Sequence, residues 1–145
     1  MKIYADHAAT TAVSDTAMAA MLPCFQGVYA NPSSLHSPGQ RAAEKLAEAR
    51  EIFARNLNAA PREITFTSGG SESDVQALRT GAALGARKGK RHILSTKFEH
   101  HAVLHTLKAL EKEGFTVTLL DIPADGVVTA EAVREALRPD TCLVS

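Results

Sequence analysis

The fold is decided by one stretch of the sequence, Thr65-Phe66-Thr67-Ser68-Gly69-Gly70-Ser71-Glu72-Ser73-Asp74. It predicts a short β-strand over residues 64–67 that passes through two glycines into a helix beginning at Ser71. Such a junction leaves backbone N–H groups unpaired at the positive end of a helix dipole, and this combination binds anions. Glycine permits the close backbone approach that a phosphate group needs. The stretch therefore predicts a phosphate-binding turn that includes Gly70 and Ser71.

The glycine turn also has a purely structural interpretation. Ser71 can cap its own helix, with Asp74 three residues on as in a variant capping box, and spacing alone favours neither interpretation. The turn lacks the G-x-G-x-x-G spacing of dinucleotide-binding proteins and the Gly-Lys-Ser/Thr ending of a Walker A loop. Glu72 and Asp74 suit the helix dipole but repel a phosphate, so they must point away from one that binds. The turn is thus a candidate anion site with no named ligand.

Strands and helices alternate after this turn. Strands are expected at residues 92–96, 115–120 and 141–145, and helices at residues 71–88, 101–113 and 129–137, with Thr129 as a cap. Gly114 is expected to end the second of these helices, and Asp125-Gly126 to form a turn. Strands that alternate with helices of this length indicate βαβ units. The expected fold class is α/β, with a mainly parallel sheet flanked by helices.

The residues before the glycine turn predict an extended segment followed by helices. Ser14 can cap a helix that reaches Phe25 and carries an apolar stripe, and Ser37-Pro38-Gly39-Gln40 matches a capping box for a helix ending near Asn58. Arg50 falls on the apolar stripe of the second helix, so it should reach outward or find a partner. The expected organisation is an extended arm (residues 1–14), N-terminal helices (15–58) and an incomplete α/β domain (62–145).

Composition limits the classes of partner. The 145 residues carry 16 basic and 16 acidic side chains, so no net charge favours nucleic acid or an anionic membrane. No apolar run approaches the roughly 18 residues of a spanning helix, and the N-terminus has no apolar signal region. We therefore expect a cytoplasmic protein. Cys24 and Cys142 are too few for a disulfide framework and lack metal-ligand spacing, so we expect no metal and small, buried cysteine side chains.

A second polar motif, Glu99-His100-His101, follows the strand expected at residues 92–96. Ligands of open α/β sheets bind at the carboxyl ends of strands. A single histidine at such a place is most often a cap or a surface residue, but proximity to the glycine turn favours a functional role for one of this pair. An imidazole there could stack on a flat ring or move a proton near neutral pH. His101 is expected to face outward.

Two earlier loops carry polar residues whose role the residues alone leave open. They are Asp6-His7-Ala8-Ala9-Thr10-Thr11, and Asn31-Pro32-Ser33-Ser34 with His36. The first is equally compatible with a segment packed into a cleft or partner subunit and with a capped loop. His92 and His105 belong to no pattern, so surface or core positions are expected for both.

Taken in order, these motifs resemble the cysteine desulfurase family, which belongs to the class V aminotransferases, pyridoxal-phosphate enzymes of fold type I. The resemblance covers the whole chain and rests on these segments: Tyr4-Ala5-Asp6-His7-Ala8-Ala9-Thr10-Thr11, Asn31-Pro32-Ser33-Ser34, Thr67-Ser68-Gly69-Gly70-Ser71-Glu72-Ser73-Asp74, Glu99-His100-His101-Ala102-Val103 and Arg138-Pro139-Asp140-Thr141-Cys142-Leu143-Val144-Ser145. It is closer to the branch that serves iron–sulfur cluster assembly than to the selenocysteine lyases. The resemblance implies part of the large domain of a PLP-dependent transferase fold.

The resemblance implies roles for particular residues. Gly70 and Ser71 fall where backbone and hydroxyl bind the phosphate of pyridoxal 5′-phosphate; the family usually has Thr at the Ser71 position, so the hydroxyl is retained. His100 falls where an imidazole stacks on the pyridine ring and assists proton transfer. It is therefore the candidate catalytic residue, and Gly70, Ser71 and His100 are the candidate cofactor-binding residues. The segment from Ala8 to Thr11 falls at the active-site entrance.

The chain also departs from the family pattern. Val75 stands where the family usually has Asn, and Ala30 where it tends to have Gly. The family's Schiff-base lysine, the aspartate that pairs with the pyridine nitrogen and the sulfur-accepting cysteine lie beyond the matched region. Lys97, Cys24 and Cys142 match none of them. We therefore expect these 145 residues to be the N-terminal part of a longer protein and to be inactive alone.

For the whole protein the resemblance implies a PLP-dependent cysteine desulfurase. Such an enzyme converts L-cysteine to L-alanine, keeps the sulfur as a persulfide on an enzyme cysteine and passes it to an acceptor protein. The resemblance also implies a homodimer. The alternatives are another class V enzyme, such as a selenocysteine lyase or an aminotransferase, and a non-catalytic truncated module for binding or dimerisation.

Overall fold

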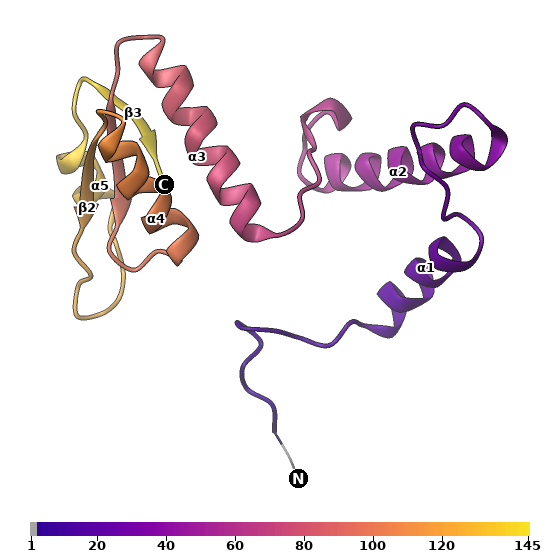
Figure 1. Ribbon diagram of the computed structural model, residues 1–145. Helices are drawn as coiled ribbons and strands as arrows, with labels where there is room; N and C mark the ends of the chain where they lie inside the picture. Colours follow the sequence, from indigo (N-terminus) through magenta and orange to yellow (C-terminus); the bar gives the residue numbers. More distant parts are fainter. Residues whose placement is uncertain (1–2) are drawn as a thin grey trace. The chain divides into compact units, whose positions relative to one another are not determined.

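The computed structural model describes residues 3–145, which separate into two compact units (Figure 1). One unit ends at Thr65, and the other spans Phe66–Ser145. Residues 1 and 2, the start of the expected arm, lie outside the described residues.

The first unit is helical. Its elements are α1 (Asp15–Gln26), α2 (Ser37–Asn56) and a short 3₁₀ helix, η1 (Pro61–Glu63). Both expected α-helices are confirmed, and the Ser14 hydroxyl caps α1 as predicted. The prediction of a capping box at Ser37 is wrong. Ser37 is already helical, and His36 caps α2 instead, because its Nδ1 atom accepts a hydrogen bond from the Gly39 N–H at 3.2 Å.

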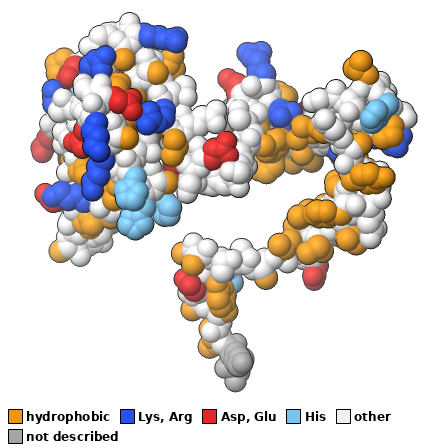
Figure 2. All heavy atoms as spheres, viewed as in Figure 1, with side chains coloured by type: hydrophobic (Ala, Val, Ile, Leu, Met, Phe, Trp, Pro, Cys, Tyr) orange, Lys and Arg blue, Asp and Glu red, His pale blue; other side chains and the backbone are white. Residues whose placement is uncertain are grey.

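Little of the first unit is buried. The apolar side chains of α1 that form the expected stripe are 44–70% exposed: Met18, Met21, Leu22 and Phe25. Figure 2 shows hydrophobic side chains gathered along the helices of this unit. Arg50 finds the partner that its position required, since its Nε atom donates to the Ile64 carbonyl at 3.2 Å. This bond ties α2 to the segment that follows η1.

The second unit is an α/β layer structure, which confirms the expected fold class. Its elements are α3 (Gly70–Ala86), β1 (His92–Thr96), α4 (His101–Lys112), β2 (Thr116–Leu120), α5 (Ala130–Ala136) and β3 (Thr141–Val144). The strands form a parallel sheet in the order β2-β1-β3. Gly114 has a φ of +89°, the left-handed conformation that a glycine adopts easily, and it ends the last turn of α4 as expected.

The core of the second unit lies between the sheet and the helices α3 and α4, which also pack on each other. It is formed by Leu78, Ala82, Ile93, Val103, Leu107 and Leu110. Full burial of a leucine, isoleucine or valine side chain stabilises a fold by about 1.5–3 kcal/mol. Helix α5 packs against β2.

The prediction of a strand at residues 64–67 is wrong. Ile64 ends η1, and no ladder joins residues 64–67 to another strand within residues 3–145. A strand exists only where its N–H and C=O groups meet a neighbour, and β1 already has β2 on one edge and β3 on the other. The apolar and β-branched residues indicate an extended backbone but cannot supply that neighbour.

Helix α3 lies very close to β3. A Cβ atom placed on Gly85 would stand 2.2 Å from the Cβ atom of Cys142, and one on Gly81 would stand 3.1 Å from the Cδ1 atom of Leu143. Cys142 is also the residue that the pairing of β3 with β1 passes over, because His92 pairs with Thr141 and Ile93 with Leu143. The absence of a side chain at position 85 therefore allows α3 to pack over an irregular stretch of β3.

Gly85→Ala should destabilise the protein by about 1–3 kcal/mol, the usual cost of overpacking, because Cys142 cannot move its Cβ atom without moving β3. Gly81→Ala is the matched control: it meets only the flexible end of Leu143, and replacing a helical glycine gains roughly 0.5–1 kcal/mol. Urea denaturation of both variants measures the difference. Equal stability of the two variants would contradict this account of the α3–β3 contact.

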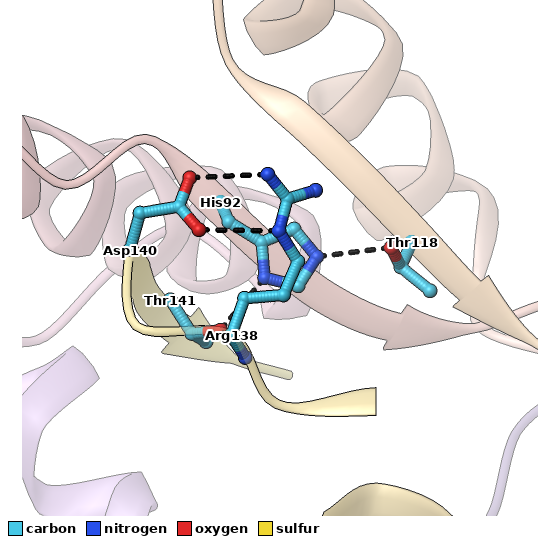
Figure 3. Close-up of polar contacts among 5 residues, drawn as sticks. All are labelled: His92, Thr118, Arg138, Asp140 and Thr141. Atoms are coloured by element: carbon cyan, nitrogen blue, oxygen red, sulfur yellow. Dashed lines mark hydrogen bonds and ion pairs between the residues drawn. The ribbon is translucent and has the colours of Figure 1, made fainter. Parts of the chain in front are cut away.

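A buried histidine joins the three strands (Figure 3). His92 is fully buried, with its Nδ1 atom 2.7 Å from the Thr141 hydroxyl and its Nε2 atom 2.9 Å from the Thr118 hydroxyl. The Thr141 oxygen also accepts the backbone N–H of Arg138 at 2.7 Å, and the Arg138 guanidinium pairs with Asp140. Burial, followed by the nearby positive charge of Arg138, holds the pKa of His92 below its ordinary value of 6.5. His92 is therefore a neutral core residue.

Stability should fall in acid because of His92. The unfolded chain takes up a proton on this ring near pH 6.5, whereas the folded chain resists until lower pH, so the stabilising contribution is present above pH 6.5 and is lost as the pH falls from there through the folded pKa. Urea denaturation between pH 8 and pH 5 should show a smaller loss for His92→Gln than for the unmodified protein. His105→Gln, at an exposed position of α4, is the control. An identical pH dependence for all three proteins would refute the role of His92.

Candidate functional site

The five α-helices of the described chain differ in how their first N–H groups are satisfied. Side chains accept hydrogen bonds from the first turn of four helices: Ser14 in α1, His36 in α2, His100 in α4 and Thr129 in α5. Helix α3 instead follows Gly69, which has no side chain to offer. The unpaired donors of a helix start are left for another acceptor there.

The first turn of α3 presents open donors. The N–H groups of Gly70, Ser71 and Glu72 have no acceptor within residues 3–145, and neither does the exposed Ser71 hydroxyl. A Cβ atom added at Gly69 or Gly70 would meet no other atom within 4 Å. The packing of this chain therefore does not require glycine at either position, and the space before the helix is open to a ligand.

The alternative interpretation, in which Ser71 caps α3, does not hold. The Ser73 N–H already donates to the Gly69 carbonyl at 3.2 Å, so the helix begins one residue earlier than the serine suggests. Ser71 then becomes the second residue of the helix, and its hydroxyl is not used by the helix itself. This removes the structural explanation that the sequence left open for Ser71.

Glu72 is held within the turn. One of its carboxylate oxygens accepts hydrogen bonds from the Ser68 N–H at 2.7 Å and from the Ser68 hydroxyl at 2.6 Å. These bonds lower the pKa of Glu72 and keep it ionised. The Thr67 hydroxyl lies 2.6 Å from that of Ser73 and 3.1 Å from the Gly69 carbonyl. The neighbouring hydroxyls thus bind the turn together, while that of Ser71 is available.

His100 lies at the start of α4. Its Nδ1 atom accepts a hydrogen bond from the Ala102 N–H at 3.1 Å, so the cap role weighed for a single histidine is present. His101 is exposed, as expected, with its ring 6.0 Å from that of His100 and 5.7 Å from that of His105. Glu99 accepts a hydrogen bond from the Thr96 hydroxyl at 2.9 Å. The motif therefore combines a helix cap with a row of exposed rings.

The structure brings the beginnings of α3 and α4 to the same edge of the sheet. A hollow of about 180 Å³ is lined from both helices and from the end of β3. The lining residues are Asp74, Ala77, Leu78, Val103, Leu143, Val144 and Ser145. Gly70, Ser71 and His100 are not among them. The candidate residues therefore share an edge, at the carboxyl ends of the strands, without sharing this hollow.

The carboxyl end of β1 carries two further polar groups. Ser95 buries a hydroxyl oxygen that has no hydrogen-bond partner in the described chain, an uncommon state for a buried polar atom. Lys97 forms an ion pair with Asp121, at the end of β2. Neither residue was singled out as a binding residue by its sequence pattern.

The two polar loops of the first unit have internal partners. The Tyr4 hydroxyl lies within hydrogen-bond distance of the Asp6 and Thr10 carbonyls, and the His7 Nδ1 atom lies 3.0 Å from the Thr11 hydroxyl. In the second loop the Asn31 side chain accepts the Ser33 N–H. A capped-loop arrangement is thus present in both.

Other kinds of site have little support in residues 3–145. No group of three or more histidine, cysteine or acidic side chains is placed to hold a metal ion, and no helix is long and apolar enough to cross a membrane. Cys24 and Cys142 are partly rather than fully buried, and burial raises the pKa of the Cys142 thiol. That thiol is therefore a weak nucleophile in this structure.

Comparison with known proteins gives consistent results. The aminotransferase class-V family profile matches residues 3–145. A putative cysteine desulfurase, IscS 1 of Bacillus subtilis (strain 168), is 48% identical over 99% of this chain, which covers 38% of that protein. A NifS-like protein of known structure superposes with a TM-score of 0.90 at 38% identity, over 99% of this chain and 39% of the other. The structure named "SspA in complex with cysteine" superposes with a TM-score of 0.84 at 39% identity, over 96% of this chain and 40% of the other. The chain thus spans about two fifths of the length of these relatives.

Proposed function

Because the chain belongs to the aminotransferase class-V family, we propose that it is the N-terminal part of a pyridoxal 5′-phosphate-dependent cysteine desulfurase. Residues 1–14 would form its arm, 15–58 its N-terminal helices and 62–145 an incomplete cofactor-binding domain. The support is that relatives matched over nearly the whole chain carry the name cysteine desulfurase, and that one structural neighbour was solved with cysteine.

The observation that carries the proposal is the open start of α3. Gly70 and Ser71 offer two backbone N–H groups, and Ser71 adds a hydroxyl, all without partners in the described chain. These are the donors that a phosphate monoester takes at a helix N-terminus. The phosphate of the family's cofactor fits this donor set. When bound, the cofactor supplies an electron sink for a substrate amino acid.

We assign the second role to His100. Its position at the start of α4, on the same edge of the sheet as the start of α3, supports a ring that stacks on the cofactor and assists proton transfer. Its Nδ1 atom is already engaged by Ala102. The lysine, aspartate and cysteine that the family requires have no matching residue in this chain.

The proposed reaction balances with a thiol of the enzyme. L-cysteine and an enzyme thiol give L-alanine and an enzyme persulfide, whose outer sulfur then passes to an acceptor protein. Iron–sulfur cluster assembly is the sulfur-consuming process that the family resemblance favours. The proposal also includes that the intact enzyme is a homodimer and that it is located in the cytoplasm.

The intact protein, supplied with pyridoxal 5′-phosphate, L-cysteine and a reductant, should release alanine and sulfide in equal amounts. Amino-acid analysis and a sulfide assay measure both products. The 145-residue chain treated in the same way should release neither, because it offers no matched lysine or sulfur-accepting cysteine. In a parallel assay with an added keto acid, transfer of the amino group to that acid without release of sulfide would instead identify an aminotransferase.

Ser71→Ala in the intact protein should weaken binding of pyridoxal 5′-phosphate about tenfold or more, since a hydrogen bond to a charged group contributes about 1.5–3 kcal/mol. Ser73→Ala is the matched control, because the Ser73 hydroxyl is occupied by Thr67 and should not contact the ligand. Fluorescence or absorbance titration gives both dissociation constants. Equal losses in the two variants would mean that the turn supports the site only indirectly.

A further inference from the structure

The cap of α4 fixes the chemistry of the His100 ring. A backbone N–H can only donate, so the Nδ1 atom that receives the Ala102 N–H at 3.1 Å must carry a lone pair and no proton. The backbone of His100, with φ −59° and ψ 151°, has the extended conformation of an N-cap residue. The hydrogen bond and the backbone conformation therefore both identify His100 as the N-cap of α4.

We infer that the two ring nitrogens of His100 have different roles. Nδ1 accepts a hydrogen bond from the first turn of α4, and Nε2 carries the single proton of the neutral ring and can donate it in a hydrogen bond. No hydrogen-bond partner of Nε2 lies within residues 3–145, and the side chain is exposed. His100 thus presents a fixed N–H donor outward, and Ala102 is the positioning residue that fixes it.

This arrangement limits how the ring exchanges protons. In its resting form Nε2 can donate a hydrogen bond but has no lone pair with which to accept a proton. A second proton can be taken up only at Nδ1, and this breaks the bond to Ala102 and leaves that N–H without its acceptor. Proton uptake by His100 is therefore coupled to release of the start of α4. That this proton serves substrate chemistry rests on the proposed function, whereas the position of the proton does not.

The chain contains a matched comparison. His36 caps α2 in the same way, with Nδ1 accepting from the Gly39 N–H at 3.2 Å, in a part of the protein to which we assign no substrate. The groups around His100 do not compete for Nδ1: His101 lies 6.0 Å away between ring centroids, and Glu99 is occupied by Thr96. The same tautomer is thus expected at both positions.

Nitrogen-15 NMR of the intact protein, labelled at histidine, tests the assignment directly. Near pH 8 the His100 signals, identified by their loss in His100→Asn, should show an unprotonated Nδ1 and a protonated Nε2. The same pattern should appear for His36. A proton on Nδ1 of His100 would overturn the inference.

Two variants separate the cap from the chemistry. His100→Asn keeps a side-chain acceptor for the Ala102 N–H, so its denaturation midpoint should stay near that of the unmodified protein, whereas His100→Ala should lower it. His36→Asn and His36→Ala provide the same comparison for α2. Equal midpoints for the two His100 variants would overturn the cap assignment. Desulfurase activity is a separate readout: full activity of His100→Asn would contradict the proposed function of the ring while the NMR result still decides the tautomer.

Discussion

Burial of β1 between two parallel neighbours is the interaction on which the second unit depends. Its first four residues are at most 1% exposed, and its two edges are paired with β2 and β3. A parallel strand covered on both faces needs helices that return along the sheet, so the chain must reverse at each strand end. Helices α3 and α4 consequently begin at the same edge. The position of the candidate site follows from this one constraint.

The two ends of the sheet use polar groups in opposite ways. At the amino end of β1 the polar groups are mutually satisfied, because His92 meets a threonine hydroxyl on each neighbouring strand and Thr141 is in turn bound to Arg138. At the carboxyl end two groups are left open in the described chain: α3 begins without a side-chain cap, and Ser95 buries a hydroxyl oxygen that has no hydrogen-bond partner. A satisfied network rigidifies a fold, whereas unpaired donors at an edge are suited to a ligand.

The sequence alone predicts the elements whose formation is local. Hydrophobic periodicity and glycine or threonine signals were sufficient for α4, α5 and the three strands of the sheet. It fails where a distant partner decides the outcome. Residues 64–67 have the composition of a strand but no neighbour to pair with, and His92 shows no pattern because its partners are 26 and 49 residues away.

Helix caps are also hard to place from sequence. Serine is the usual cap, so the sequence favours Ser37 and Ser71, whereas a histidine and a glycine occupy the cap positions of α2 and α3. The roles of Gly70, Ser71 and His100 come from family resemblance, since spacing cannot distinguish an anion site from a capped helix.

The proposed binding of an anion at the uncapped start of α3 would couple ligand binding to the stability of the fold. In the other four α-helices of the described residues a side chain accepts a hydrogen bond from one N–H of the first turn. An anion that binds α3 and not the unfolded chain adds to the stability of the folded state by mass action, in proportion to the logarithm of its concentration above the dissociation constant. The folded fraction of such a protein then depends on the supply of its cofactor. A cell that runs short of the cofactor would lose the protein to proteolysis as well as its activity, so abundance would report on cofactor supply.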